Sequence, residues 1–97
     1  MAVQDRFAPA PPTGVAALPR EGGVEVSWSP SPEADLARYR VYRTVAGGAP
    51  TRVGEALTGE TSLVDRSPGT GAVAYTVTAV DRDGNESEPS RPAEVRR

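Results

Sequence analysis

The chain has 97 residues, a formal net charge of −2 at pH 7, 37% hydrophobic and 25% charged residues, and neither Cys nor His. This length supports one modest core, and the missing Cys and His exclude disulfides, thiol nucleophiles, imidazole bases and nearly all zinc sites. Ten Gly and ten Pro are too many for a helical bundle and favour many short strands joined by turns.

Proline dominates the beginning of the chain. Residues 8–12 read Ala-Pro-Ala-Pro-Pro, and proline favours an extended polyproline II segment because it donates no backbone hydrogen bond. The first residues therefore resemble a linker. We expect residues 1–8 to be linker and residues 9–97 to be one folded domain.

Two strands are predicted before residue 30. The first covers residues 13–18, with Val15 and Leu18 turned inward, and ends at the turn formed by residues 19–23. The second covers residues 24–28, where alternation places Val24, Val26 and Trp28 on one face. Trp28 is the largest side chain of the protein, so we expect it at the centre of the core.

The third strand is predicted over residues 38–43, with Leu36 at its start and with Tyr39 and Val41 turned inward. A short strand is expected at residues 51–53 together with Leu57, and another at residues 61–64 with Leu63 inward. Residues 74–81 alternate most clearly and form the strand around which the others are organised. The last strand lies within residues 90–95, and Pro89 and Pro92 restrict it to an edge position.

Seven short strands with turn signals every 8–12 residues predict an all-β protein, an immunoglobulin-like β-sandwich with no disulfide. Six inward side chains define the expected structural core: Trp28, Tyr39, Val41, Leu63, Tyr75 and Val77.

The chain also resembles a fibronectin type III domain over about residues 9–96. The resemblance rests on these residues: Pro11-Pro12, Trp28, Leu36, Tyr39-Arg40-Val41-Tyr42-Arg43 and Tyr75-Thr76-Val77-Thr78-Ala79-Val80-Asp81. The tail over residues 84–90 is similar to the version common in bacterial extracytoplasmic proteins. The resemblance implies that the Tyr75 hydroxyl reaches back to a backbone group in the preceding crossover, although Gly69 stands where the family commonly has Leu.

This resemblance, the proline-rich beginning and the lack of catalytic residue types imply a non-catalytic module rather than an enzyme. We expect it to act as a spacer or scaffold in a larger bacterial protein that is secreted or lies in the cell envelope. Its expected partners are neighbouring domains of the parent chain. We expect the protein to be a monomer that binds no cofactor, nucleic acid or metal. We also expect no membrane insertion, because the sequence has no run of about 18 apolar residues.

The alternative is a protein-binding module for adhesion or interaction, with a protein ligand. Strand parity places six side chains on the outer face of the third and sixth predicted strands, as one exposed patch: Arg38, Arg40, Tyr42, Thr76, Thr78 and Val80. Arg and Tyr are enriched where protein partners dock. The same residues are also ordinary solvated cover and strand packing.

The loop over residues 81–88 is the other candidate surface. Asp81, Asp83 and Asn85 have the spacing of the first half of a calcium loop, but Glu86 and Pro92 stand where that loop needs Gly and Glu. Asp-Gly-Asn is also ordinary turn chemistry. A turn and a weak Ca²⁺ site both remain open at this stage, with the turn favoured.

Overall fold

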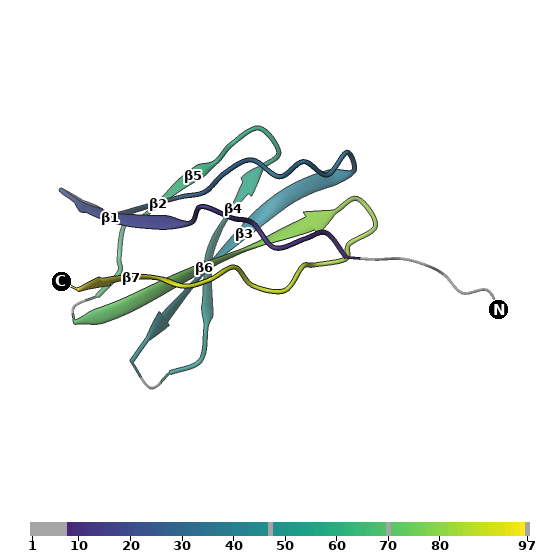
Figure 1. Cartoon of the computed structure of the whole chain (residues 1–97). Helices are drawn as coiled ribbons and strands as arrows, with labels where there is room; N and C mark the ends of the chain where they lie inside the picture. The colour runs from purple at the N-terminus through teal and green to yellow at the C-terminus, as the bar shows by residue number, and fades with distance from the viewer. Residues whose placement is uncertain (1–7, 47, 70, 97) are drawn as a thin grey trace.

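A computed structural model describes residues 8–46, 48–69 and 71–96 of the chain. Seven strands form two antiparallel sheets, one with the order β1-β2-β5 and one with the order β4-β3-β6-β7 (Figure 1). The strands are β1 (Ala16–Arg20), β2 (Gly23–Ser27), β3 (Leu36–Val45), β4 (Thr51–Leu57), β5 (Ser62–Asp65), β6 (Ala72–Asp81) and β7 (Ala93–Arg96). The predicted all-β, immunoglobulin-like sandwich is confirmed.

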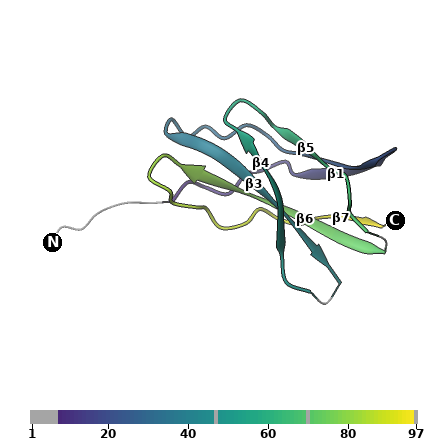
Figure 2. The same ribbon diagram turned by 180° about the vertical axis from the view of Figure 1, so that it is seen from behind.

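Strand β6 is the central element, as its alternation predicts. It pairs with β3 from Val45↔Val73 to Leu36↔Asp81, and with β7 over Ala72–Tyr75. Viewed from behind, β3 and β6 cross the middle of the larger sheet with β4 on one side of them (Figure 2). None of the described residues forms a helix long and apolar enough to cross a membrane.

The core lies between the two sheets, and Trp28 and Tyr39 pack within it. Their ring centroids are 5.1 Å apart with an interplanar angle of 57°. Five of the six expected core residues are buried, and Leu63 is partly buried against them. Since inward and outward side chains alternate along a strand, the alternation in the sequence was sufficient to place these residues.

The first strand differs from its prediction. It begins at Ala16 and continues through Pro19 to Arg20, and Leu18 is 63% exposed. The register explains the exposure, because Leu18 lies opposite the outward Glu25 while Ala17 lies opposite the buried Val26. Pro19 is tolerated because β1 is an edge strand, where a missing N–H removes no ladder bond.

The tight connection from β1 to β2 requires glycine. Gly23 has φ +152°, and a Cβ atom at this position would overlap the backbone carbonyl of Asp65. Since only glycine adopts such a conformation readily and leaves room for the neighbouring strand, this residue fixes the approach of β2 to β5.

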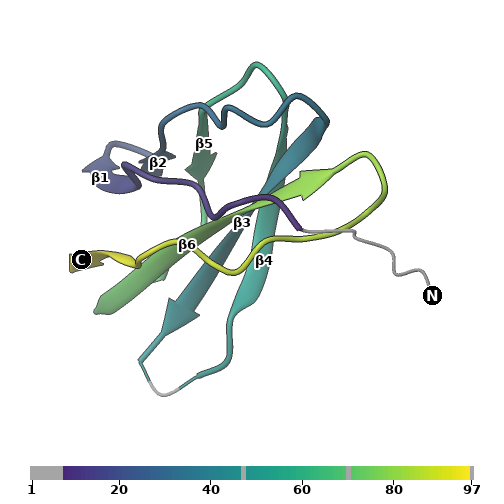
Figure 3. The same cartoon turned by 45° about the vertical axis from the view of Figure 1, so that its right-hand side comes forward.

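Two irregular segments run side by side along the seam between the sheets, as Figure 3 shows. One comprises residues 8–15, in which Pro9 and Pro12 are buried against the sandwich. The other comprises residues 85–92, which lie between β6 and β7 in the sequence and run beside the part of β6 that β7 does not pair with. Apart from Ala8, the expected linker of residues 1–8 lies outside the described residues.

Candidate interaction surface

The six side chains expected on the outer face are brought together by the β3–β6 ladder. Arg38 lies opposite Val80, Arg40 opposite Thr78, and Tyr42 opposite Thr76. We call these six residues the outer face. A hollow of about 270 Å³ adjoins them, and Tyr42, Pro50, Thr76 and Pro89 contribute to its lining.

The expectation that all six side chains are exposed was wrong. Thr78 is 3% and Val80 is 1% exposed, although both point away from the core residues Val77 and Ala79. Residue Glu86 forms an isolated β-bridge with Val80, and its carboxylate accepts a hydrogen bond of 2.7 Å from the Thr78 hydroxyl. The segment after β6 therefore folds back over this part of the outer face.

Glu86 is the polar centre of the outer face. Its Oε2 accepts hydrogen bonds from the hydroxyls of Tyr42 and Thr78, and its Oε1 accepts one of 3.1 Å from Arg40 Nη1. Arg40 Nε also donates to Glu55 Oε2 at 3.0 Å. One carboxylate thus joins the segment after β6 to both central strands of the sheet.

These contacts change the ionisation of the cluster. Burial alone would raise the pKa of Glu86, but the hydrogen bonds from Tyr42 and Thr78 and the charge of Arg40 outweigh it and lower the pKa. Burial and the hydrogen bond to Glu86 raise the pKa of Tyr42. The hydrogen bond to Glu55 raises the pKa of Arg40 despite the opposing effect of burial.

The sequence does not predict this role for Glu86. By its position in the chain, Glu86 is a member of the acidic loop over residues 81–88 and stands where a calcium loop needs glycine. Its partners Tyr42 and Arg40 lie 44 and 46 residues away in the sequence. Side-chain pairs at such separations leave no periodic pattern to detect.

The loop after β6 is a hydrogen-bonded turn centred on Asp81. Asp81 Oδ1 accepts bonds from the backbone N–H groups of Asp83 (3.0 Å) and Asn85 (2.8 Å), and Oδ2 accepts one of 3.1 Å from the Asn85 side chain. These donors engage the oxygens that a cation would need. Within residues 8–46, 48–69 and 71–96, no group of three or more acidic side chains is placed to hold a metal ion.

A second carboxylate connects the two sheets. Asp65 of β5 accepts hydrogen bonds from the Tyr75 hydroxyl (2.7 Å), Arg43 Nη1 (2.7 Å) and the Ser67 N–H (3.2 Å). Burial opposes ionisation of Asp65, but the bonds from Tyr75, Arg43 and Ser67 together lower its pKa. Sequence reasoning did not identify this side-chain partner of the Tyr75 hydroxyl. The backbone partner that the resemblance implies stays a prediction.

The departure at Gly69 does not prevent Tyr75 from making this contact. Gly69 has φ +80°, a left-handed conformation that glycine adopts without strain. The crossover therefore turns sharply at Gly69 before the chain enters β6.

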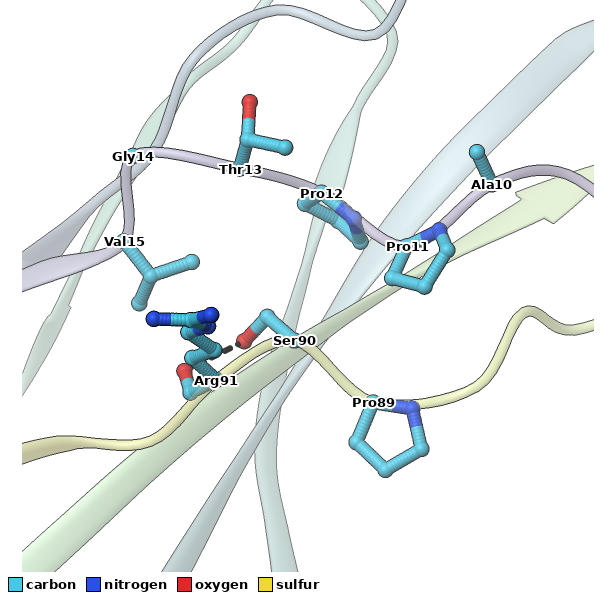
Figure 4. Close-up of a pocket in the computed structure, with 9 residues that line it drawn as sticks. All are labelled: Ala10, Pro11, Pro12, Thr13, Gly14, Val15, Pro89, Ser90 and Arg91. Atoms are coloured by element: carbon cyan, nitrogen blue, oxygen red, sulfur yellow. Dashed lines mark hydrogen bonds between the residues drawn. The ribbon is translucent and has the colours of Figure 1, made fainter.

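An open apolar groove of about 600 Å³ follows the seam between the irregular segments (Figure 4). Pro11, Pro12 and Val15 line one side, while Pro89, Ser90 and Arg91 line the other, and the side chains of Val15 and Arg91 lie toward each other. The prolines of its walls supply apolar surface and no backbone N–H, while Arg91 supplies charged donors.

The described polar groups form structural contacts. The carboxylates of Asp65, Asp81 and Glu86 each accept at least three hydrogen bonds from groups of the domain itself. These bonds hold strands and loops of the domain together.

The chain is similar to a short stretch of two much larger proteins. It is 39% identical over 89 residues to an amylopullulanase of Thermoanaerobacterium saccharolyticum, which is 90% of this chain and 7% of that protein. An amylopullulanase of Thermoanaerobacter thermohydrosulfuricus is 38% identical over 94 residues, which is 95% of this chain and 6% of that protein. The chain thus spans only 6–7% of the length of these relatives.

No protein-family model matches the chain. Among solved structures, a Fn3-like protein from Clostridium thermocellum is similar with a TM-score of 0.73 and 33% sequence identity, and the match covers 91% of this chain and 92% of that one. Because this similarity in sequence and fold extends over nearly the whole of both chains, the protein belongs to the fibronectin type III-like family.

Proposed function

We propose that residues 9–97 are a non-catalytic fibronectin type III module that acts as a spacer or scaffold in a larger bacterial protein, secreted or in the cell envelope. The observation that carries this proposal is the size of the match in the two amylopullulanases, where the similar stretch makes up 7% and 6% of the protein. The rest of each of those chains, more than nine-tenths of it, lies outside the stretch that resembles this module. The partners of this module are then the neighbouring domains of its own parent chain.

The path of the chain supports a spacer role. The described chain begins at one end of the sandwich and ends at the opposite end, as the views from both sides agree (Figures 1 and 2). A module with this geometry holds its two neighbours apart along its length. The module would do so as a monomer and without nucleic acid or membrane contact.

The chemistry supports a non-catalytic role. The chain has no His and no Cys, which are frequent general bases and nucleophiles. Its buried carboxylates, Asp65 and Asp81, are held by donors of the domain.

Scattering and binding measurements together test the spacer proposal. The module is fused between two folded reporter proteins, and small-angle X-ray scattering gives the separation of the reporters. We expect a fixed separation, because the folded domain allows one end-to-end distance, whereas a Gly/Ser linker of equal length gives a broad distribution with a larger average, about 50 Å end to end. Native electrophoresis in gels containing pullulan or soluble starch should leave the mobility unchanged. A broad separation would contradict the spacer role, and retardation by glucan would indicate a carbohydrate-binding module instead.

A protein-binding role is the second candidate, and the assembly of the outer face favours it. Arg38, which has no ion pair among the described residues, lies on this face beside Arg40 and Tyr42. Chain immobilised on a resin should capture a specific protein from native extract, and Arg38→Ser should lose that capture while Arg20→Ser, on the other sheet, keeps it. Equal capture by both variants would exclude the outer face.

A further inference from the structure

Residues 85–92, which we call the strap, cover the part of β6 that β7 does not reach. Strand β7 pairs only with Ala72–Tyr75, whereas β6 continues to Asp81. The strap therefore takes the place of a strand beside the second half of β6. Its sequence contains two successive Ser-x-Pro units, which begin at Ser87 and at Ser90.

Serine hydroxyls replace the usual ladder acceptors in the strap. The N–H groups of Val77 and Ala79 donate to Ser90 Oγ (3.0 Å) and Ser87 Oγ (2.9 Å). In return, the N–H groups of Ser90 and Ser87 donate to the carbonyls of Val77 (2.9 Å) and Ala79 (2.8 Å). The strap thus uses three residues for every two of β6, so it is not a regular strand.

The strap has almost no apolar anchor. Its buried residues are the two serines, while Glu88, Pro89, Arg91 and Pro92 are exposed. The next large apolar residue, Val95, belongs to β7 and is 6% exposed. Segments with few buried apolar contacts open at lower free energy than the core does. Lifting the strap therefore breaks hydrogen bonds but exposes little buried apolar surface.

Glu86 is the strap's main side-chain attachment to the sheet. Its carboxylate is held by Arg40 and Tyr42 of β3 and by Thr78 of β6. The other charged groups near it are Glu55, which also binds Arg40, and Arg52, whose Nη1 lies 3.5 Å from Glu55 Oε2. Without the Glu86 carboxylate, the strap would depend on the bonds between Asn85 and Asp81 at its first residue and on its backbone and serine bonds to β6.

We propose that the strap lifts from β6 as a local unit while the sandwich stays folded, and that Glu86 is its latch. The closed strap covers Thr78 and Val80 and occupies the edge N–H groups of Val77 and Ala79. The lifted strap exposes all of these groups at once and completes the outer face. The strap is thus a built-in cover, whether or not the outer face has a partner.

Amide hydrogen exchange measured by NMR on the whole chain tests this proposal. In the wild type, the Val77 and Ala79 amides should exchange through an opening that is insensitive to low urea concentrations, whereas the Val41 amide in β3 should exchange only through urea-sensitive global unfolding. Exchange of all three amides through the same urea-sensitive opening would overturn the proposal.

The variant Glu86→Gln tests the latch. It should accelerate exchange at Val77 and Ala79 by about fivefold or more relative to any change at Val41. The control Glu88→Gln changes an exposed carboxylate of the same strap and should leave the ratio unchanged. A uniform acceleration at all three amides in Glu86→Gln would show that Glu86 supports only global stability, and it would contradict the latch.

Discussion

The hydroxyl of Tyr75 in β6 donates a hydrogen bond of 2.7 Å to the carboxylate of Asp65 in β5, so that this pair joins the two sheets of the sandwich. Asp65 is 6% exposed and Tyr75 is fully buried. Arg43, from the same sheet as Tyr75, binds the same carboxylate oxygen. The chain has no cysteine, so its sheets are joined by this polar contact and by core packing, whereas antibody domains also have an inter-sheet disulfide.

Tyr75→Phe removes this hydrogen bond and keeps the ring. Because the acceptor is a carboxylate, the free energy of unfolding should fall by about 1.5–3 kcal/mol. Urea denaturation followed by Trp28 fluorescence measures it. In the control, Tyr39→Phe removes an acceptor of the neutral Ser31 N–H and should cost about 0.5–1.5 kcal/mol. A smaller loss for Tyr75→Phe than for Tyr39→Phe would contradict the role of Asp65.

The stability of the domain should fall in acid. The pKa values of Asp65 and Glu86 are both lowered in the folded state, so both carboxylates favour folding above their ordinary pKa values. This contribution is lost as the pH falls through the folded pKa values. Urea midpoints measured from pH 7 to pH 2 should fall from about pH 5 downward.

Asp65→Asn supplies the comparison for this acid dependence. The variant should be less stable than the wild type at pH 7, because Asn carries no charge for Arg43 and accepts from fewer donors. The difference between the two proteins should narrow toward pH 2, where the wild-type carboxylate is protonated. A difference that stays constant over this range would mean that Asp65 does not contribute through its charge.

Thr78→Val removes one donor from Glu86 without changing the volume much. The buried Thr78 hydroxyl donates to the Glu86 carboxylate, so we expect a loss of about 1.5–3 kcal/mol of unfolding free energy. Thr76→Val is the matched control, since Thr76 is only half-buried on the same face. Thermal or urea unfolding compares the two variants, and equal stabilities would contradict a structural role for the hydroxyl.

Trp28→Ala should be the most damaging of these changes. Trp28 is 5% exposed and packs on Tyr39, so its truncation should cost about 3–5 kcal/mol, much of a typical domain's stability. Trp28→Phe should cost less than half as much, because it keeps a ring and removes Nε1, which is buried without a partner among the described residues. Far-UV circular dichroism on both variants decides this, and an unchanged melting temperature for Trp28→Ala would refute the central packing of Trp28.

The sequence predicted those parts of the fold that depend on local alternation. Val24 and Val26, or Val77 and Ala79, alternate with outward residues on one strand, so a period of two was enough to place them. Leu18 was misplaced because its parity depends on the register across a turn, and Pro19 wrongly suggested that the strand had ended.

The polar contacts could not be predicted. Asp65 and Glu86 each bind side chains from other strands, and their role appears only once β3 and β6 are paired. Strand parity was enough to find the residues of the outer face, but it did not predict the burial of Thr78. Thr78 is covered by the strap, and Ser87 and Ser90 anchor the strap through side-chain bonds that leave no periodic pattern in the sequence.

The spacer role rests most directly on the distance between the two ends of the domain. Strand β6 has ten residues and runs along the sandwich, so the ends should lie about 30 Å apart. Because the chain has no Cys, the double variant Ala8→Cys and Arg96→Cys can be labelled with one nitroxide at each end. Pulsed electron–electron double resonance then measures the distance between the two labels. We expect one narrow distance distribution that stays the same when domains are fused at both ends. A broad distribution, or a separation well under about 20 Å, less than six residues of extended strand, would contradict the account.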